Sequence, residues 1–224
     1  MGYADREILK GMMKLVMISD THEKRPTDIP DGDVLIHAGD FTMSGRLKYL
    51  SEELTWFKSL PHRHKIWVAG NHDWACQHFM TEKHEDLLRE ASAPAIYLRD
   101  SGVTIDGRFF YGSPWQPWFC DWAFNLQRGA EIKKKWDIIP NDVDVLITHG
   151  PPKHILDWVG RDAAGCEELA KAVNGRVMPK VHVFGHIHGA YGYRNYGRTH
   201  YFNASMVNEG YQLDPKHKAW EFEL

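Results

Sequence analysis

Residues 34–40, VLIHAGD, decide the fold, because a short, apolar, β-branched run ends there at a glycine and an aspartate. The same arrangement recurs along the chain, since other apolar runs with the length and composition of buried strands are each followed closely by Asp, Asn or His. The apolar runs lie at residues 15–18, 34–36, 66–69, 143–147 and 181–184. We therefore expect several buried strands whose ends carry polar side chains.

Helical patterns lie between these strands. The segment between the second and third runs has apolar residues at helical spacing and Ser44 as a candidate N-cap. Its apolar residues are Leu47, Leu50, Leu54 and Phe57. Further helices are expected at 131–136 and 166–173, and two strands of a second sheet at 109–111 and 201–203. Strands that alternate with helices indicate a layered α/β fold.

Polar side chains gather at the predicted strand ends. Ligands of open α/β sheets bind beyond the carboxyl ends of the strands, so these side chains are expected to meet. Each alone has an ordinary structural interpretation, such as a helix cap, a turn or a core histidine. Together they would be costly to bury without a shared compensating charge, which a pair of divalent cations supplies. The candidate metal ligands are Asp20, His22, Asp40, Asn71, His149, His186 and His188.

The chemistry of the candidate ligands also narrows the choice of metal ion. Carboxylates, imidazoles and an amide carbonyl without thiolates suit two ions of Mn, Fe, Zn, Co or Ni, with manganese favoured, better than copper, magnesium or calcium. A short carboxylate must bridge two such ions, and Asp40 is the natural bridge. His37 and His182 lie inside strands, so we expect them in the core or behind the ligands.

Composition indicates an ordinary globular protein, and its charge suits a small ligand better than a polyanion. The chain has 224 residues, 43% of them hydrophobic, and a net charge of −3, so we expect one domain over residues 1–224 with residues 1–13 as a peripheral extension. The net negative charge argues against long nucleic acids as substrates or partners. No run is long enough for a membrane span. Three widely spaced cysteines, Cys76, Cys120 and Cys166, predict reduced thiols and a cytoplasmic location.

The ordered motifs D-x-H, GD, GNHD, a later His and GHxH resemble those of the calcineurin-like metallophosphoesterase superfamily. This resemblance implies two mixed β-sheets packed as a sandwich flanked by helices, with a dinuclear metal site at the strand ends. It implies that His72 protonates the leaving oxygen and that Asp40 bridges the metals. One metal would be held by Asp20, His22 and His188, and the other by Asn71, His149 and His186.

Longer blocks resemble the small class III phosphodiesterase branch, the metallophosphoesterase-domain-containing group. They are GDVLIHAGDFT, AGNHDW, GSPWQPWFCDWAFN, THGPP and HVFGHIHGAYG. The resemblance implies activity on cyclic nucleotides and aryl phosphodiesters. Met43 and Ser44 stand where the protein-phosphatase branch has Asp and Arg, which argues against phosphoprotein substrates.

The leading hypothesis is a phosphodiesterase in which a metal-bridging hydroxide attacks phosphorus and His72 donates a proton to the leaving group. Two alternatives stay open, namely a phosphomonoesterase and a non-catalytic scaffold of the same fold. Asp73 either orients His72 or a ligand, or is an exposed turn residue. Residues 113–125 are expected to form a structured loop, in which Trp115 or Trp118 stacks on a base or aryl group or packs in the core.

Overall fold

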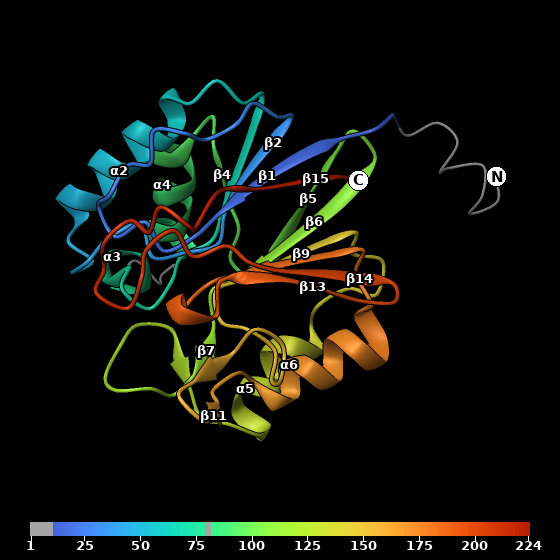
Figure 1. Cartoon of the computed structure of the whole chain (residues 1–224). Helices are drawn as coiled ribbons and strands as arrows, with labels where there is room; N and C mark the ends of the chain where they lie inside the picture. The colour runs from blue at the N-terminus through green and yellow to red at the C-terminus, as the bar shows by residue number, and fades with distance from the viewer. Residues whose placement is uncertain (1–10, 79–81) are drawn as a thin grey trace.

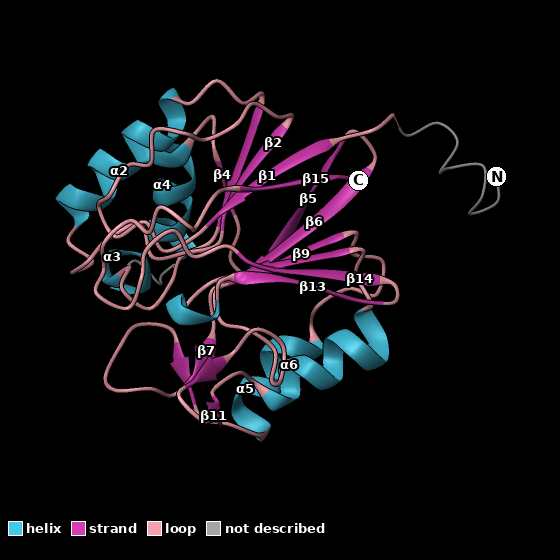
Figure 2. Ribbon diagram, in the orientation of Figure 1, coloured by secondary structure: helices cyan, strands magenta, loops and turns pink. Residues whose placement is uncertain are grey.

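The computed structural model describes residues 11–78 and 82–224 and shows two mixed sheets packed face to face with helices outside them (Figures 1 and 2). In the first sheet the strand order is β15-β1-β2-β3-β4, with β15 antiparallel and the others parallel. Its strands are β1 (Lys14–Ile18), β2 (Val34–His37), β3 (His64–Trp67), β4 (Ile96–Tyr97) and β15 (Trp220–Glu223).

The second sheet has the order β13-β14-β12-β9-β6-β5, in which the four central strands are parallel and both edge strands antiparallel. Its strands are β5 (Ser101–Ile105), β6 (Arg108–Ser113), β9 (Val145–Thr148), β12 (Val181–Phe184), β13 (Gly192–Tyr196) and β14 (Thr199–Asn203). Each of the five predicted apolar runs overlaps a strand, although β3 ends at Trp67 and β9 begins at Val145, inside the predicted runs. The strands predicted at 109–111 and 201–203 lie in this sheet as β6 and β14. The sandwich implied by the family resemblance is confirmed.

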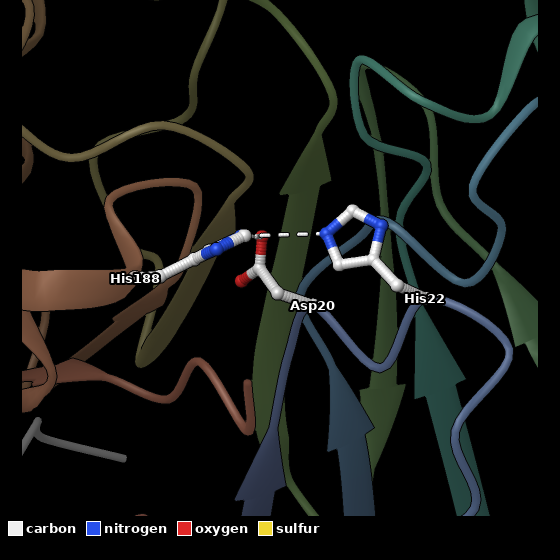
Figure 3. Close-up of side chains that lie close together, drawn as sticks. All are labelled: Asp20, His22 and His188. Atoms are coloured by element: carbon white, nitrogen blue, oxygen red, sulfur yellow. Dashed lines mark hydrogen bonds and ion pairs between the residues drawn. The ribbon is translucent and has the colours of Figure 1, made fainter. Parts of the chain in front are cut away.

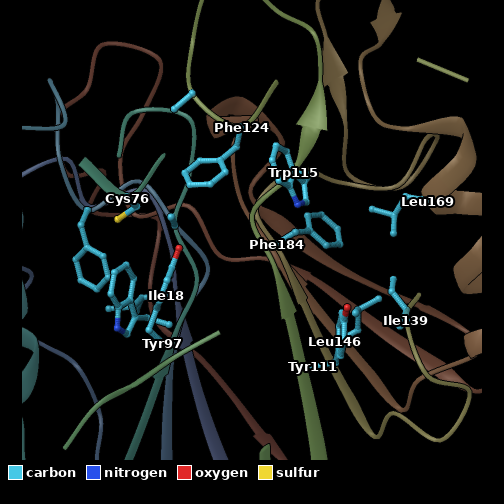
Figure 4. Close-up of a cluster of buried hydrophobic side chains, with 14 of the residues drawn as sticks. Ile18, Cys76, Tyr97, Tyr111, Trp115, Phe124, Ile139, Leu146, Leu169 and Phe184 are labelled. Atoms are coloured by element: carbon cyan, nitrogen blue, oxygen red, sulfur yellow. The ribbon is translucent and has the colours of Figure 1, made fainter. Parts of the chain in front are cut away.

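The alternation of side chains along each strand divides the core. Leu15 and Met17 of β1 pack in a cluster with Val145 and Val181 of the second sheet, so this cluster fills the space between the sheets. The intervening side chains of β1, including Ile18, face the other way and pack in a second cluster with helix residues. Figure 4 draws part of this second cluster, with side chains from both sheets.

Helices cover both outer faces of the sandwich. The first sheet is covered by α2 (Leu47–Ser59), α3 (Trp74–His78) and α4 (Glu82–Ser92), and the second by α5 (Ala130–Asp137) and α6 (Glu167–Ala172). A π-helical turn η1 (Val173–Val177) and a short 3-10 helix η2 (His188–Ala190) follow.

The helix α2 shows what the periodicity predicted and where it failed. Leu50, Leu54 and Phe57 are buried as expected, but Leu47 is exposed. Ser44 as N-cap was wrong: Arg46 holds that position without a side-chain cap, because Gly45 takes a left-handed conformation (φ +65°) that delays the first turn.

Two small ribbons extend beyond the sandwich near the strand ends. The segment 113–125 is not entirely a loop, because β7 (Gln116–Pro117) pairs in parallel with β8 (Asn125–Leu126). The second ribbon is the hairpin of β10 (Trp158–Val159) and β11 (Asp162–Ala163).

The structure also bears on the predictions for the N-terminal residues, the cysteines and a membrane span. Of the predicted N-terminal extension, residues 1–10 lie outside the described residues, and Met13 is buried and hydrogen-bonded to Leu224. Cys76, Cys120 and Cys166 are free thiols. Within the described ranges, no helix is long and apolar enough to cross a membrane.

Candidate metal centre

The parallel strands of both sheets bring their polar ends to one place. In the first sheet, Asp20 follows β1, Asp40 follows β2, and Asn71 and His72 follow β3. In the second sheet, His149 follows β9, and His186 and His188 follow β12. His186 and His188 are partly buried, and the other candidate ligands are buried. A cavity of about 460 Å³ opens over this group, and Asp40, Asn71, His72, His186 and His188 contribute to its lining.

Asp20, His22 and His188 form the first group of donor atoms (Figure 3). The Nε2 atoms of His22 and His188 lie 3.3 Å apart, and Nε2 of His188 lies 3.4 Å from Oδ1 of Asp20. Donor atoms that bind one ion at about 2.0 to 2.2 Å are expected roughly 3 to 3.5 Å from one another. The separations therefore suit a single shared ion.

Asn71, His149 and His186 form the second group. The side-chain oxygen Oδ1 of Asn71 lies 2.8 Å from Nε2 of His149 and 2.7 Å from Nδ1 of His186. Asp40 joins the two groups, because its Oδ2 lies 3.6 Å from Nε2 of His22 and 3.4 Å from Nε2 of His149. One carboxylate oxygen thus faces both groups of donors.

Backbone carbonyls determine which ring nitrogens are free. Nδ1 of His22 contacts the carbonyl oxygen of Thr42 at 3.1 Å, and Nδ1 of His149 contacts that of Ala38 at 3.0 Å. Nδ1 of His188 contacts the carbonyl of Asn208 at 3.2 Å. A carbonyl only accepts, so each Nδ1 carries a proton, and each ring presents the lone pair of Nε2 when it is neutral.

These lone pairs face other acceptors, which is unfavourable unless a proton or a cation lies among them. His149, for example, presents Nε2 to the oxygens of both Asn71 and Asp40. The donor set therefore fits divalent cations, with outer carbonyls that orient the rings as they commonly do around metals.

The electrostatics of the group agree with this chemistry. Burial lowers the pKa of His149, but the Asp40 carboxylate outweighs burial and raises that pKa to about 9, so that a proton can take the place of a cation. Burial lowers the pKa of His22 to about 4 and that of His186 to about 3, which keeps these rings neutral and able to bind a metal.

Asp73 holds the turn that carries Asp40. It is fully buried, so its interpretation as an exposed turn residue was wrong. Its Oδ2 accepts from the backbone N–H of Asp40 at 3.0 Å and of Gly70 at 2.9 Å, and its Oδ1 accepts from the N–H and hydroxyl of Thr42. Burial raises the pKa of Asp73 to about 6. Asp73 therefore fixes the backbone at a ligand instead of contacting the His72 ring.

His72 lies between the candidate ligands and an aromatic wall. Its Nδ1 donates to the carbonyl of Met43 at 2.8 Å, which leaves Nε2 as the second ring nitrogen available for proton transfer. The Trp122 ring stacks on the His72 ring with centroids 4.1 Å apart and planes inclined by 28°. The His22 ring meets it edge-on at 4.6 Å.

The predicted aromatic residues separate into two environments. Trp118, Phe119 and Trp122 all line the cavity. Trp118 is 51% exposed. Trp115 is only 6% exposed, is absent from the cavity lining, and donates through Nε1 to Asp100 at 2.8 Å. The structure thus brings Trp118 to the candidate site and leaves Trp115 in the core.

Several residues of the cavity lining were not singled out from the sequence, among them Trp122 and Tyr211. Trp122 belongs to the tryptophan-rich block that the sequence singled out, so attention to that whole block could have found it. Tyr211 belongs to no motif.

His37 and His182, expected in the core, are both completely buried within β2 and β12. Burial lowers the pKa of each to about 3. Nε2 of His37 contacts the Thr21 hydroxyl at 3.0 Å, and Nε2 of His182 contacts that of Thr148 at 2.8 Å. Both histidines therefore lie behind the strand ends as neutral structural groups.

Comparisons with known proteins agree with this arrangement. The family model described as calcineurin-like phosphoesterase matches residues 13–190. Human metallophosphoesterase domain-containing protein 1 is 44% identical over 223 residues, which cover 90% of this chain and 68% of that protein. The UPF0046 protein K07C11.7 of Caenorhabditis elegans is 40% identical over 221 residues, which cover 91% of this chain and 73% of that protein.

A solved structure shows the same fold at low sequence identity. Phosphopantetheinyl hydrolase (PptH) from Mycobacterium tuberculosis superposes with a TM-score of 0.62 and 16% identity. The match covers 94% of this chain and 95% of that one.

Proposed function

The chain belongs to the calcineurin-like phosphoesterase family, whose members hydrolyse phosphoesters with divalent metals, and we propose that it is a phosphodiesterase for cyclic nucleotides or other small phosphodiesters. The proposal rests on one observation: two groups of metal-donor atoms, joined by Asp40, lie at one end of a cavity whose wall is aromatic. The ion at Asp20, His22 and His188 and the ion at Asn71, His149 and His186 would both contact Asp40.

Two divalent ions in this position, with manganese as the favoured metal, would polarise the phosphoryl oxygens and provide a nucleophile at neutral pH. The protein's part in the reaction lies in its side chains. His72 is anchored by the Met43 carbonyl at Nδ1, so the doubly protonated ring would carry its second proton on Nε2 and pass it to the departing alkoxide or phenoxide, leaving a neutral imidazole. Trp122 keeps the His72 ring in place by stacking on it.

The charge of the cavity favours diesters over monoesters. Apart from histidines, Arg128 is the only cationic side chain among the described residues that line the cavity, and Glu167 pairs with it at 2.6 Å. Arg128 also donates to the carbonyls of Ala164 and Gly165. A monoester dianion would find little positive charge beyond the metals, whereas a diester carries a single negative charge.

The aromatic wall supports a substrate with a base or an aryl group. Trp118 and Trp122 both line the cavity, although one face of Trp122 already stacks on His72. Stacking of a base on an aromatic side chain is worth about 1–3 kcal/mol. Phosphomonoesterase activity on nucleotides or small phosphates is the second candidate, since the same ligands would serve it. A scaffold without activity is the least supported, because all seven ligand positions and His72 are intact.

A panel of esters tests the proposal. The manganese-loaded protein is assayed with 2′,3′- and 3′,5′-cyclic nucleotides, bis(p-nitrophenyl) phosphate and p-nitrophenyl phosphate, and its metal content is measured. We expect diesters to be hydrolysed with the higher kcat/KM. Faster hydrolysis of the monoester would identify a phosphomonoesterase. Failure to hydrolyse any ester with two ions bound would identify a scaffold.

Asp40→Asn and Asp31→Asn form a matched pair for the same assay. Asp40→Asn removes the charge that faces both donor groups and should abolish hydrolysis and lower metal content. Asp31 is exposed, so Asp31→Asn should behave as the parent protein.

A further inference from the structure

Tyr211 lies in the loop that follows β14, and its ring covers the candidate metal centre. Its ring centroid is 4.9 Å from that of His22 and 5.2 Å from that of His188, both with edge contacts. The His72 ring lies 5.7 Å away. Tyr211 also lines the cavity. One tyrosine thus contacts two candidate ligands and the candidate proton donor.

The surrounding loop holds this tyrosine firmly. The backbone N–H of Tyr211 donates to the carbonyl of Asn208 at 2.9 Å, and Oδ1 of Asn208 accepts from the N–H groups of Gly210 and Gln212. Tyr211 itself has a φ of +57°, a left-handed conformation that is strained for a bulky side chain. Strain of this kind is common at functional sites, where the surrounding structure enforces it.

The hydroxyl of Tyr211 is not used within the described part of the protein. The hydroxyls of Tyr191, Tyr193 and Tyr201 have partners, a carbonyl, a histidine and an asparagine respectively. Those of Tyr97 and Tyr111 do not line the cavity and are buried without a partner in the described ranges. Among the residues that the structure describes, the Tyr211 hydroxyl has none. Tyr211 therefore brings an unused hydrogen-bond donor to the wall of the cavity.

Histidines aside, the described lining of the cavity offers no free cationic side chain that could orient a phosphoryl group. Met43 and Ser44 offer no cationic group, and Arg128 is already engaged by Glu167 and two carbonyls. A phosphoryl group at the metals would still need orientation by the protein, and a hydroxyl donor provides it without adding charge.

We propose that the hydroxyl of Tyr211 donates a hydrogen bond to a phosphoryl oxygen of the substrate, so that the 207–213 loop forms a phosphoryl-binding site beside the metals. This inference rests on the proposed function, since it requires a phosphoryl group at the metal centre. The occupant is a tetrahedral phosphoryl group, whether it belongs to a diester, a monoester or inorganic phosphate.

Binding of inorganic phosphate to the manganese-loaded protein tests this site by calorimetry. Tyr211→Phe keeps the ring contacts with His22 and His188 and removes only the hydroxyl. We expect phosphate to bind about ten- to a hundredfold more weakly, as for a lost hydrogen bond to a charged group. Metal content and Tm should stay unchanged, and KM for a diester should rise more than kcat falls. Tyr196→Phe, at an exposed tyrosine of β13, is the matched control and should bind phosphate as the parent does.

The possible failures are distinguishable. Equal phosphate affinity in the parent and Tyr211→Phe would overturn the role of the hydroxyl and leave the proposed function standing. Loss of metal from Tyr211→Phe would also overturn it, because the hydroxyl would then act on the metal ligands. Absence of both phosphate binding and ester hydrolysis in the metal-loaded parent would refute the proposed function, and this inference with it.

Discussion

Nε2 of His22 and Nε2 of His188 lie 3.3 Å apart, although each ring already donates its Nδ1 proton to a backbone carbonyl. Two imidazole lone pairs at this distance repel each other unless a proton or a cation lies between them. His149 is in the same situation opposite Asn71, and its pKa, raised to about 9, lets a proton fill that position. Bound divalent ions would take the place of such protons at the candidate metal centre.

Removal of metal should destabilise the protein. An ion present at 100 times its Kd stabilises the folded state by about 2.7 kcal/mol, and about 1 kcal/mol shifts the Tm of a protein of this size by roughly 2–4 °C. We expect EDTA to lower the Tm by several degrees and manganese to restore it, as followed by calorimetry. The Tm of Asp40→Asn should respond much less to EDTA. An identical response in both proteins would place the stabilising ion elsewhere.

His72→Ala should impair hydrolysis without loss of metal. A general acid contributes roughly 10²- to 10⁴-fold to rate, and its contribution shrinks when the leaving group is acidic. We expect a large fall in kcat for cyclic nucleotides and a small one for bis(p-nitrophenyl) phosphate, with metal content unchanged. A uniform loss across leaving groups would contradict proton donation by His72.

Trp118→Ala should impair substrate binding, whereas Trp115→Ala should impair stability. Trp118 lines the cavity, so its loss should raise KM for cyclic nucleotides about tenfold or more and leave that of dimethyl phosphate unchanged. Trp115 is buried against Asp100 and Phe124, so its loss should lower stability by about 3–5 kcal/mol. Thermal melts and steady-state kinetics on both variants separate the two roles. An unchanged nucleotide KM in Trp118→Ala would exclude stacking there.

Stability should fall in acid because of buried neutral histidines. Burial lowers the pKa of His182 to about 3, whereas an unfolded histidine has a pKa of about 6.5. Between these values the unfolded chain binds the extra proton, so stability rises with pH across this window and is lost as pH falls from about 6.5 toward 3. Each such histidine contributes up to about 1.4 kcal/mol per pH unit.

His182→Asn should flatten this dependence. Urea unfolding of parent and variant at pH 8 measures the effect on packing alone, because the histidine is then neutral in both states. Between pH 6.5 and 4 the stability of the variant should fall less steeply than that of the parent. Parallel curves over this range would show that His182 does not titrate on unfolding.

The sequence by itself determined the strands and the polar residues that follow them. A strand in a buried sheet needs a short apolar run, and a parallel strand can deliver polar groups only at its carboxyl end, so both features are written locally, as in residues 34–40. The helix α2 was equally readable from the spacing of Leu50, Leu54 and Phe57. These elements depend on neighbours within a few residues, and for that reason a layered α/β fold could be predicted. The two-sheet sandwich itself was implied by the resemblance to the metallophosphoesterase superfamily.

Tertiary structure alone decided which side chains meet. The proton on Nδ1 of His149 depends on Ala38, more than 100 residues away, and the buried position of Trp115 depends on Asp100. Tyr211 reaches His22 only because the loop after β14 folds back over the ends of the first sheet. Such contacts join segments far apart in the chain, and their geometry depends on how the two sheets pack, which no local pattern encodes.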